Sequence, residues 1–260
     1  MQIKGARVLL TGANGGLGRA IGQALKAKGA DLLITGRREG SLAPAAEALG
    51  ARSLVADLAD RVDVERLAEA AGSVDILVAN AALPASGTVL SYEAEQIDAA
   101  LEVNLRAPIM LAHRLAPPMI EAGRGHIVMI GSLAGKASSP SNALYSATKF
   151  GLRGFTLGLR QDLDGTGVGV SLIQPGFVRD AGMFHNTGIK PPAGVRTASP
   201  SQVSEAVLTA IHRNSAEVNV APFEVRVLSA LGGQFPLLAE RVQRRVVSEE
   251  LKERMDRMRR

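Results

Sequence analysis

Six short apolar runs, separated by longer stretches with helical periodicity, dominate the pattern of this 260-residue chain. Runs that are apolar almost throughout are typical of strands buried on both faces of a parallel sheet. Strands alternating with helices in this way predict an α/β fold with a doubly wound parallel sheet and right-handed crossovers. The predicted strands are Val8–Thr11, Asp31–Thr35, Ser53–Ala56, Ile76–Ala79, His126–Ile130 and Val168–Ile173.

Helical spacing of apolar residues between these runs predicts the remaining elements. The predicted helices are Gly16–Lys28, Ser41–Leu49, Val62–Ala71, Ala94–Glu121 with a break near Arg106–Pro108, and Asn142–Asp162. The length fits one domain over residues 1–220, with a lid at about 180–200 that is rich in glycine and proline. Residues 221–260 form a C-terminal helical extension, in which Val247, Leu251, Met255 and Met258 recur at the spacing of an amphipathic helix.

Composition and charge exclude several classes of site and partner. With no cysteine and four histidines that lack metal-ligand spacing, neither a disulfide framework nor a metal site is expected. Residues 241–260 hold eight Arg or Lys against four acidic residues, so they carry +4 of the net +5 and leave a nearly neutral body. Nucleic-acid binding is therefore not expected.

The ends of the chain bear on where the protein works. Because no signal core or long apolar segment is present, we expect a cytoplasmic protein. For the amphipathic C-terminal segment, packing on the body or on a second subunit is favoured. Attachment to an anionic membrane surface is the alternative, but the segment also carries acidic residues and lacks aromatic ones.

A glycine-rich turn follows the first predicted strand and opens the first predicted helix. Glycine lets the backbone approach a pyrophosphate closely, and the helix N-terminus supplies unpaired N–H groups. The turn therefore predicts a dinucleotide site, although a glycine turn can also serve only to pack helix on strand. The candidate cofactor contacts are Thr11, Gly12, Asn14, Gly16, Leu17 and Gly18.

Two arginines, Arg37 and Arg38, follow the second predicted strand. A carboxylate at this place would bind a free ribose 2′-hydroxyl, whereas guanidinium groups suit a 2′-phosphate through charge-assisted hydrogen bonds. Glu39 comes only after both arginines. NADP(H) is therefore favoured over NAD(H), with a merely solvated loop as the alternative.

Later in the chain, the spacing of a serine, a tyrosine and a lysine indicates a candidate proton-transfer site. Tyr145 and Lys149 are four residues apart, which places them on one face of a helix, and Ser132 lies upstream. Free tyrosine titrates near pH ~10, so we expect the nearby ammonium to assist proton exchange at neutral pH. Taken singly, each residue could instead be a cap, a turn residue or half of a surface pair.

Together with the glycine turn, Asn80 and Asn104, these residues give a chain that resembles the short-chain dehydrogenase/reductase family over residues 5–220. The resemblance implies a Rossmann fold and assigns catalytic roles to Asn104, Ser132, Tyr145 and Lys149, with Asn104 holding a water of the proton relay. Further cofactor contacts implied by the resemblance are Asp57, Leu58, Asn80, Tyr145, Lys149, Pro175, Gly176 and Val178.

The implied activity is NADP(H)-dependent interconversion of a ketone and a secondary alcohol on an apolar small molecule, with Tyr145 as the acid and base. A first alternative is reduction of a 3-oxoacyl group on a carrier. A second is a sensor or scaffold that binds NADP(H) without turnover, which would not need the Ser132 and Tyr145 hydroxyls. The resemblance also suggests a homodimer or homotetramer.

Two segments depart from the family pattern. Ala79, Asn80, Ala81 and Ala82 replace the usual Asn-Asn-Ala-Gly, and Asp180 stands where a threonine often contacts the pyrophosphate. A carboxylate near phosphates is unfavourable unless a cation such as Arg179 offsets it. In the lid, Met183, Phe184 and Ile189 are candidates to line the substrate pocket or only to pack the lid down.

Overall fold

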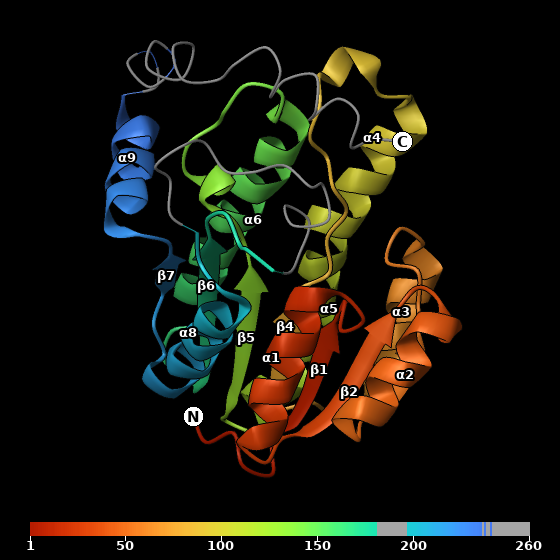
Figure 1. Ribbon diagram of the computed structural model, residues 1–260. Helices are drawn as coiled ribbons and strands as arrows, with labels where there is room; N and C mark the ends of the chain where they lie inside the picture. The colour runs from red at the N-terminus through yellow and green to blue at the C-terminus, as the bar shows by residue number, and fades with distance from the viewer. Residues whose placement is uncertain (181–196, 236, 238–239, 241–260) are drawn as a thin grey trace.

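The computed structural model describes residues 1–180, 197–235, 237 and 240 (Figure 1). The lid residues Met183, Phe184 and Ile189 lie outside the described residues. So does the predicted amphipathic helix with Val247, Leu251, Met255 and Met258. The expectations for the lid and for that helix therefore stay predictions.

Seven parallel strands form a single sheet in the order β3-β2-β1-β4-β5-β6-β7, which confirms the doubly wound fold of one domain. Six of the strands were predicted to within two residues at each end. The strands are β1 Arg7–Thr11, β2 Asp31–Gly36, β3 Arg52–Val55, β4 Ile76–Ala79, β5 Gly125–Ile130, β6 Val168–Pro175 and β7 Glu217–Val220.

Helices cover both faces of the sheet, as Figure 1 shows with α1 and α8 in front and α5 and α6 behind. α1, α2 and α8 pack on one face, whereas α3, α5 and α6 pack on the other. The α-helices are α1 Gly16–Ala27, α2 Glu39–Leu49, α3 Arg61–Ala71, α4 Ala94–Leu101, α5 Ala107–Glu121, α6 Ala143–Asp162, α8 Pro200–Arg213 and α9 Phe223–Gln234.

The central strands are buried on both faces, which is why their sequences read as continuous apolar runs. Along β1, Val8 and Leu10 enter the core under α1 and α8, while Leu9 enters the core under α3 and α5. All three side chains are fully buried. Since burying such a side chain stabilises the fold by about 2 kcal/mol, the alternation along β1 holds both helix layers on one sheet.

The predicted break near Arg106–Pro108 is a π-helical turn over Glu102–Arg106 that joins α4 directly to α5. Pro108 does not end the helix: it lies in the first turn of α5, directly after the π-helical turn. Instead of a break, the sequence produces one widened turn, and that turn carries Asn104.

Two elements near the end of the domain, α8 and β7, are absent from the sequence-based prediction. The signal for α8 is present in the chain. Ser199 and Gln202 form a capping box, and Pro200 occupies the first helical turn. β7 is only four residues long and begins with Glu217, so its sequence lacks the apolar run that marked the other strands.

α9 is the part of the C-terminal extension that the structure describes, and it lies beyond β7 at the edge of the sheet (Figure 1). Several of its apolar side chains are exposed, including Phe223, Leu228 and Leu231. Among the described residues, no helix has both the length and the apolar character that crossing a membrane requires.

His126 is a buried histidine with a structural environment. Its Nε2 lies 2.9 Å from the Ser171 hydroxyl, and that hydroxyl donates its own hydrogen to the Ser215 carbonyl. Ser171 therefore accepts from His126, which assigns the neutral tautomer protonated at Nε2. Burial lowers the pKa of His126 to about 4, and the nearby charges of the N-terminus and Arg160 act in the same direction.

This environment predicts an acid-sensitive contribution to stability. Because the folded-state pKa lies below the usual value, the unfolded chain binds the proton more readily, and the unfolding free energy falls as pH drops from about 6.5 to about 4. The loss attributable to His126 is at most about 3 kcal/mol. Urea denaturation of wild type and His126→Gln at pH 7 and pH 4 measures it. Equal losses in the two proteins would show that His126 does not contribute.

Candidate active site

The predicted site residues gather because parallel strands place all their carboxyl ends at one edge of the sheet. At the centre of that edge, the strand order reverses between β1 and β4. Thr11, at the end of β1, accepts hydrogen bonds at its hydroxyl from the Asn80 and Ala81 backbone N–H groups, both at 3.0 Å. The Asn80 amide donates back to the Thr11 and Gly12 carbonyls at 2.9 and 3.2 Å. These bonds lock together the two loops that flank the reversal.

The glycine turn after β1 lies too close to its neighbours for side chains. A Cβ on Gly12 would stand 2.8 Å from the Ala81 Cα, and Gly12 also has a φ of +67°. A Cβ on Gly18 would overlap the Gly12 carbonyl and stand 2.8 Å from the Ala13 Cα. α1 begins at Gly16 without any side-chain cap, and the neighbouring Leu17 is only partly buried. The turn thus leaves the positive end of a helix uncapped beside bare backbone.

The end of β2 carries the two arginines beside this turn. Asn14 donates from its amide to the Ser41 hydroxyl at 3.0 Å, and Ser41 donates to the Arg38 carbonyl at 3.1 Å. The glycine turn and the arginine loop are therefore joined. Arg37 and Arg38 are both exposed, and neither guanidinium forms an ion pair with a residue that the structure describes. Both remain available for an anion.

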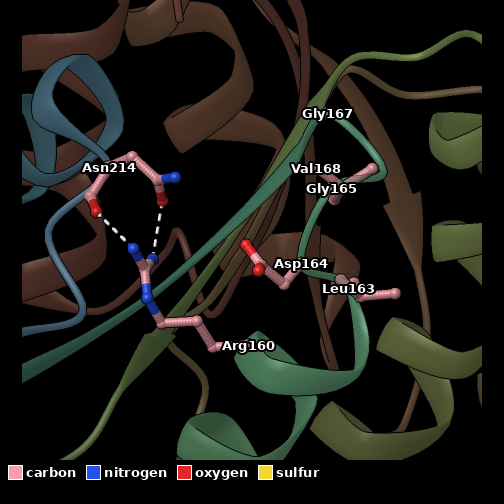
Figure 2. Close-up of a pocket in the computed structure, with 7 residues that line it drawn as sticks. All are labelled: Arg160, Leu163, Asp164, Gly165, Gly167, Val168 and Asn214. Atoms are coloured by element: carbon pink, nitrogen blue, oxygen red, sulfur yellow. Dashed lines mark hydrogen bonds between the residues drawn. The ribbon is translucent and has the colours of Figure 1, made fainter.

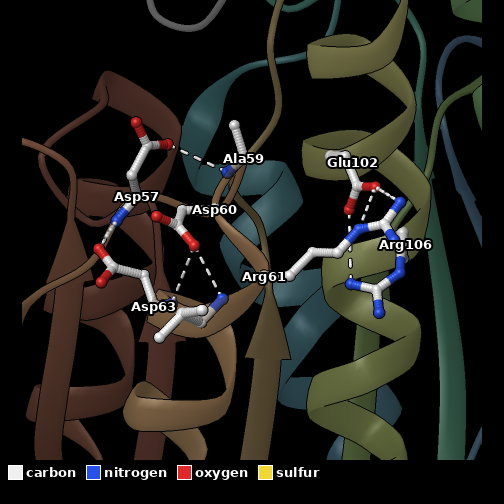
Figure 3. A network of polar contacts seen from close by, with 8 residues as sticks. Asp57, Ala59, Asp60, Arg61, Asp63, Glu102 and Arg106 are labelled. Carbon is white, nitrogen blue, oxygen red and sulfur yellow. Dashed lines mark hydrogen bonds and ion pairs between the residues drawn. The ribbon is translucent and has the colours of Figure 1, made fainter.

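The loop after β3 is ordered by carboxylates, as Figure 3 shows. Asp57 accepts from the Ala59 N–H at 3.0 Å, and the Asp57 N–H donates to Asp63 at 2.9 Å. Asp60 caps α3 by accepting from the Val62 N–H at 2.8 Å. One oxygen of Asp57 is thus used within its own loop, while Leu58 is buried. Asp63 gave no signal in the sequence beyond being an acidic residue in the first turn of a helix.

The proposed proton-transfer group is assembled between two segments. Ser132 ends the loop after β5 and caps a short 3-10 turn, Leu133–Gly135, by accepting from the Ala134 N–H at 3.2 Å. This turn packs so tightly on α6 that a Cβ on Gly135 would stand 2.6 Å from the Lys149 carbonyl. The close approach brings the Ser132 side chain beside Tyr145 on α6, near enough to oppose the rise in the pKa of the phenol.

Lys149 lies one helical turn after Tyr145 and is 3% exposed. Its Nζ donates to the Ile130 carbonyl at 2.9 Å and stands 5.7 Å from the centre of the Tyr145 ring. An ammonium has three hydrogens, so this bond to Ile130 leaves two further donors on Lys149. Tyr145 and Lys149 thus share one face of α6, as their four-residue spacing predicted, and the turn after β5 places Ser132 beside them.

The charges of this group differ from the expectation. Burial raises the pKa of Tyr145 to about 12, against an opposing hydrogen bond with Ser132, and burial lowers the pKa of Lys149 to about 8. The nearby ammonium was expected to make the phenol more acidic, but the largest effect on its pKa is desolvation, which disfavours the phenolate although the Tyr145 side chain is only partly buried. At neutral pH Tyr145 is therefore a protonated phenol.

Asn104 lies in the π-helical turn and is 1% exposed. Its side-chain oxygen accepts from the Leu83 N–H at 2.6 Å, and its amide donates to the Leu83 carbonyl at 3.0 Å. The side chain therefore holds the segment after β4, a contact that no feature of the sequence indicates. These two bonds leave one N–H and one lone pair on the side chain, and the backbone carbonyls of the widened turn are further candidate acceptors for a water.

The last predicted contacts follow β6. Pro175 ends the strand, Gly176 donates from its N–H to the Val220 carbonyl at 3.1 Å, and Val178 is buried against Ala198. Asp180, in the left-handed region with a φ of +63°, forms an ion pair with Arg179 at 3.4 Å. Arg179 is therefore the cation beside this carboxylate, whereas a different path of the loop away from the phosphates stays an alternative.

A pocket of about 230 Å³ lies away from these residues (Figure 2). This pocket lies near the amino end of β6, and Arg160 and Asn214 are among the residues that line it. Arg160 donates to the side chain and to the carbonyl of Asn214 at 2.6 and 2.9 Å. Because the proposed site occupies the carboxyl ends of the strands, this pocket lies at the opposite edge of the sheet.

Comparison with known proteins agrees with this geometry. The family model for short chain dehydrogenase matches residues 6–191. The ketoacyl reductase HetN of Nostoc sp. is 34% identical over 256 residues, covering 93% of this chain and 89% of its own. A short-chain dehydrogenase from Sphingobium yanoikuyae, solved in complex with NADPH, is 26% identical with a TM-score of 0.78, covering 90% of this chain and 95% of that one. A metagenomic short-chain oxidoreductase solved with NADP is 30% identical with a TM-score of 0.71, covering 85% and 97%.

The crowding at the glycine turn predicts the result of adding one methyl group. Gly12→Ala forces a Cβ against the Ala81 backbone at a positive φ, so we expect it to lower the unfolding free energy by about 2 to 4 kcal/mol. Gly154→Ala is the matched control, because it adds the same group to the exposed face of α6 with no heavy atom within 4 Å. The control should be neutral or up to about 1 kcal/mol more stable. Urea denaturation compares them, and equal stabilities would contradict the close approach.

Proposed function

The chain belongs to the short-chain dehydrogenase/reductase family and is an oxidoreductase, and on that premise we propose that it uses NADP(H) to interconvert a ketone and a secondary alcohol. The observation that carries the proposal is that Ser132, Tyr145 and the buried ammonium of Lys149 come together where the turn after β5 packs on α6. In the proposal, both hydroxyls point to one carbonyl oxygen of an apolar small molecule.

The residues at the strand ends fit a phosphorylated dinucleotide. The bare backbone at Gly12 and Gly18 and the uncapped start of α1 suit a pyrophosphate, with Thr11 and Asn80 keeping that cradle in place. In the proposal, Asp57 and Leu58 hold the adenine end, and Pro175, Gly176 and Val178 hold the nicotinamide end. Asn14, Gly16 and Leu17 complete the phosphate turn.

Arg37 and Arg38 support the choice of NADP(H). Both guanidinium groups are exposed at the end of β2, next to the glycine turn, and no described carboxylate neutralises them. A 2′-phosphate would be bound there by charge-assisted hydrogen bonds. The two structural relatives solved with NADPH and NADP are consistent with this assignment.

When bound, the nicotinamide cofactor supplies or accepts the hydride. In the direction of reduction, Tyr145 donates its proton to the carbonyl oxygen of the substrate. Its pKa of about 12 keeps the phenol protonated at neutral pH, which is the form that donation requires, and an alkoxide is basic enough to take that proton. Ser132 donates a hydrogen bond to the same oxygen and stabilises its developing negative charge.

Lys149 and Asn104 support this proton transfer. With a pKa of about 8, Lys149 remains mostly protonated at pH 7, so its ammonium stabilises the phenolate left by donation. One of its hydrogens is bound to Ile130, and the others are proposed to reach the cofactor ribose and the proton relay. Asn104 holds the adjoining segment through Leu83, and a relay water would bind a backbone carbonyl of its turn.

Reduction of a 3-oxoacyl group on a carrier is a second candidate. The observation that favours it is the 34% identity to a protein named ketoacyl reductase over nearly the whole chain. The same hydroxyl pair would serve, because the reacting group is again a ketone. A sensor or scaffold without turnover is less well supported, since binding alone would not require the Ser132 and Tyr145 hydroxyls.

Removal of the Tyr145 hydroxyl tests the proposed proton donor. Tyr145→Phe keeps the ring but removes the proton, so we expect kcat to fall by about 10²- to 10⁴-fold. NADPH binding, measured by fluorescence titration, should change little because the ring and Lys149 remain. Loss of NADPH absorbance with a panel of ketones and 3-oxoacyl thioesters is the activity measurement, and it also separates the two candidate substrates. A fully active variant would exclude Tyr145 as the donor.

Replacement of the arginines tests cofactor choice. Arg37→Ala combined with Arg38→Ala removes the proposed 2′-phosphate contacts, and we expect KM for NADPH to rise at least about 10-fold, equivalent to about 1.4 kcal/mol. KM for NADH should change by less than about 2-fold, because NADH has no 2′-phosphate. Steady-state kinetics with both cofactors measure the split. Equal changes with the two cofactors would mean that these arginines do not select NADP(H).

A further inference from the structure

Glu217, the first residue of β7, bonds to two cations from two different segments. One carboxylate oxygen, Oε1, pairs with Lys136 Nζ, and the other, Oε2, accepts from Arg153 Nε at 2.8 Å. Neither the family resemblance nor the proposed mechanism gives this triad a role.

The two cations belong to the two segments that form the proposed active site. Lys136 ends the 3-10 turn that begins after Ser132. Arg153 follows Lys149 by one helical turn on α6, so Tyr145, Lys149 and Arg153 recur every four residues along the helix. Glu217 therefore bridges the Ser132 segment and the Tyr145 helix from a third element, β7, which is hydrogen-bonded to β6 through Leu172.

The Lys136–Glu217 arm of this bridge is better shielded from water than the ion pairs of the described residues outside the triad. The side chains of Glu217 and Lys136 are 17% and 15% exposed, and that of Arg153 is 36% exposed. In every pair outside the triad, at least one side chain is 35% exposed or more. Burial alone would raise the pKa of Glu217, but the hydrogen bonds and charges of Lys136 and Arg153 outweigh it and lower the pKa. The carboxylate is therefore ionised at neutral pH.

We infer that Glu217 is a positioning residue that sets the distance between the Ser132 and Tyr145 hydroxyls by holding their two segments to β7. The inference rests on the proposed proton donation by Tyr145. Without the carboxylate, Lys136 and Arg153 would be neighbouring like charges that repel each other. The repulsion would separate the segments, and an error of about 1 Å in such a site can cost about 10²-fold in rate.

Glu217→Gln tests the inference, because it keeps the shape of the side chain and removes its charge. We expect kcat to fall at least about 10-fold, with the Kd for NADPH changing by less than about 2-fold. The matched control is Glu65→Gln, which breaks a carboxylate–arginine pair of 2.6 Å between Glu65 on α3 and Arg114 on α5, away from the Ser132 and Tyr145 segments. The control should keep kcat within about 2-fold of wild type.

A rescue distinguishes positioning from general loss of structure. Adding Lys136→Met to Glu217→Gln removes the like-charge repulsion, so kcat should recover by at least about 3-fold while the KM of the cofactor stays constant. If Glu217→Gln does not fold, Lys136→Met alone tests the inference, because it removes only the ion pair between Glu217 and the Ser132 segment. We expect it to lower kcat by about 3-fold or more and to leave the Kd for NADPH unchanged.

The outcomes separate this inference from the proposed function. A Glu217→Gln enzyme with the kcat of the Glu65→Gln control would overturn the positioning role, provided that Tyr145→Phe is inactive in the same assay. A double variant no faster than Glu217→Gln would overturn it as well. If Tyr145→Phe has wild-type activity, the proposed function itself is wrong.

Discussion

The parallel pairing of seven strands is the constraint on which the rest of the structure depends. It brings residues as far apart in the chain as Thr11, Asn80, Ser132 and Pro175 to one edge of the sheet, because every strand ends there. The hydrogen bonds of Thr11 to Asn80 and Ala81 then tie the central loops at the reversal of strand order. A slip of one residue in the pairing of β1 would turn Leu9 to the wrong helix layer. The strand register that fills the two cores therefore also positions the site.

Buried polar groups concentrate where the chemistry is proposed. Lys149 and Asn104 are almost fully buried, and each is held by backbone groups, Lys149 by Ile130 and Asn104 by Leu83. A buried ammonium costs stability, which its lowered pKa records, whereas an apolar side chain would not. The surface ion pairs, such as Arg52 with Asp31, contribute at most about 1 kcal/mol each. The buried ammonium of Lys149 is thus a costly group that lies beside Tyr145.

Much of the fold could be predicted because local pattern and tertiary environment agree. The runs that form β1 to β6 are apolar because both faces of the sheet are covered, and the periodic stretches between them form the helices that cover it. β7 could not be predicted in this way, because an edge strand that begins with Glu217 needs no apolar run. The turn at Asn104 was read as a break, because Pro108 signals the end of one helix and the start of another equally well.

The sequence by itself determined the glycine turn, the order of the elements and the four-residue spacing of Tyr145 and Lys149, because each depends on neighbours along the chain. Only the tertiary structure decided the charges of the site, since desolvation depends on everything packed around a group. It raised the pKa of Tyr145 instead of lowering it. The bridge from Glu217 to Lys136 and Arg153 likewise depends on the tertiary structure. Glu217 follows Lys136 by 81 positions and Arg153 by 64, so the three side chains meet only when β7 joins the sheet beside β6.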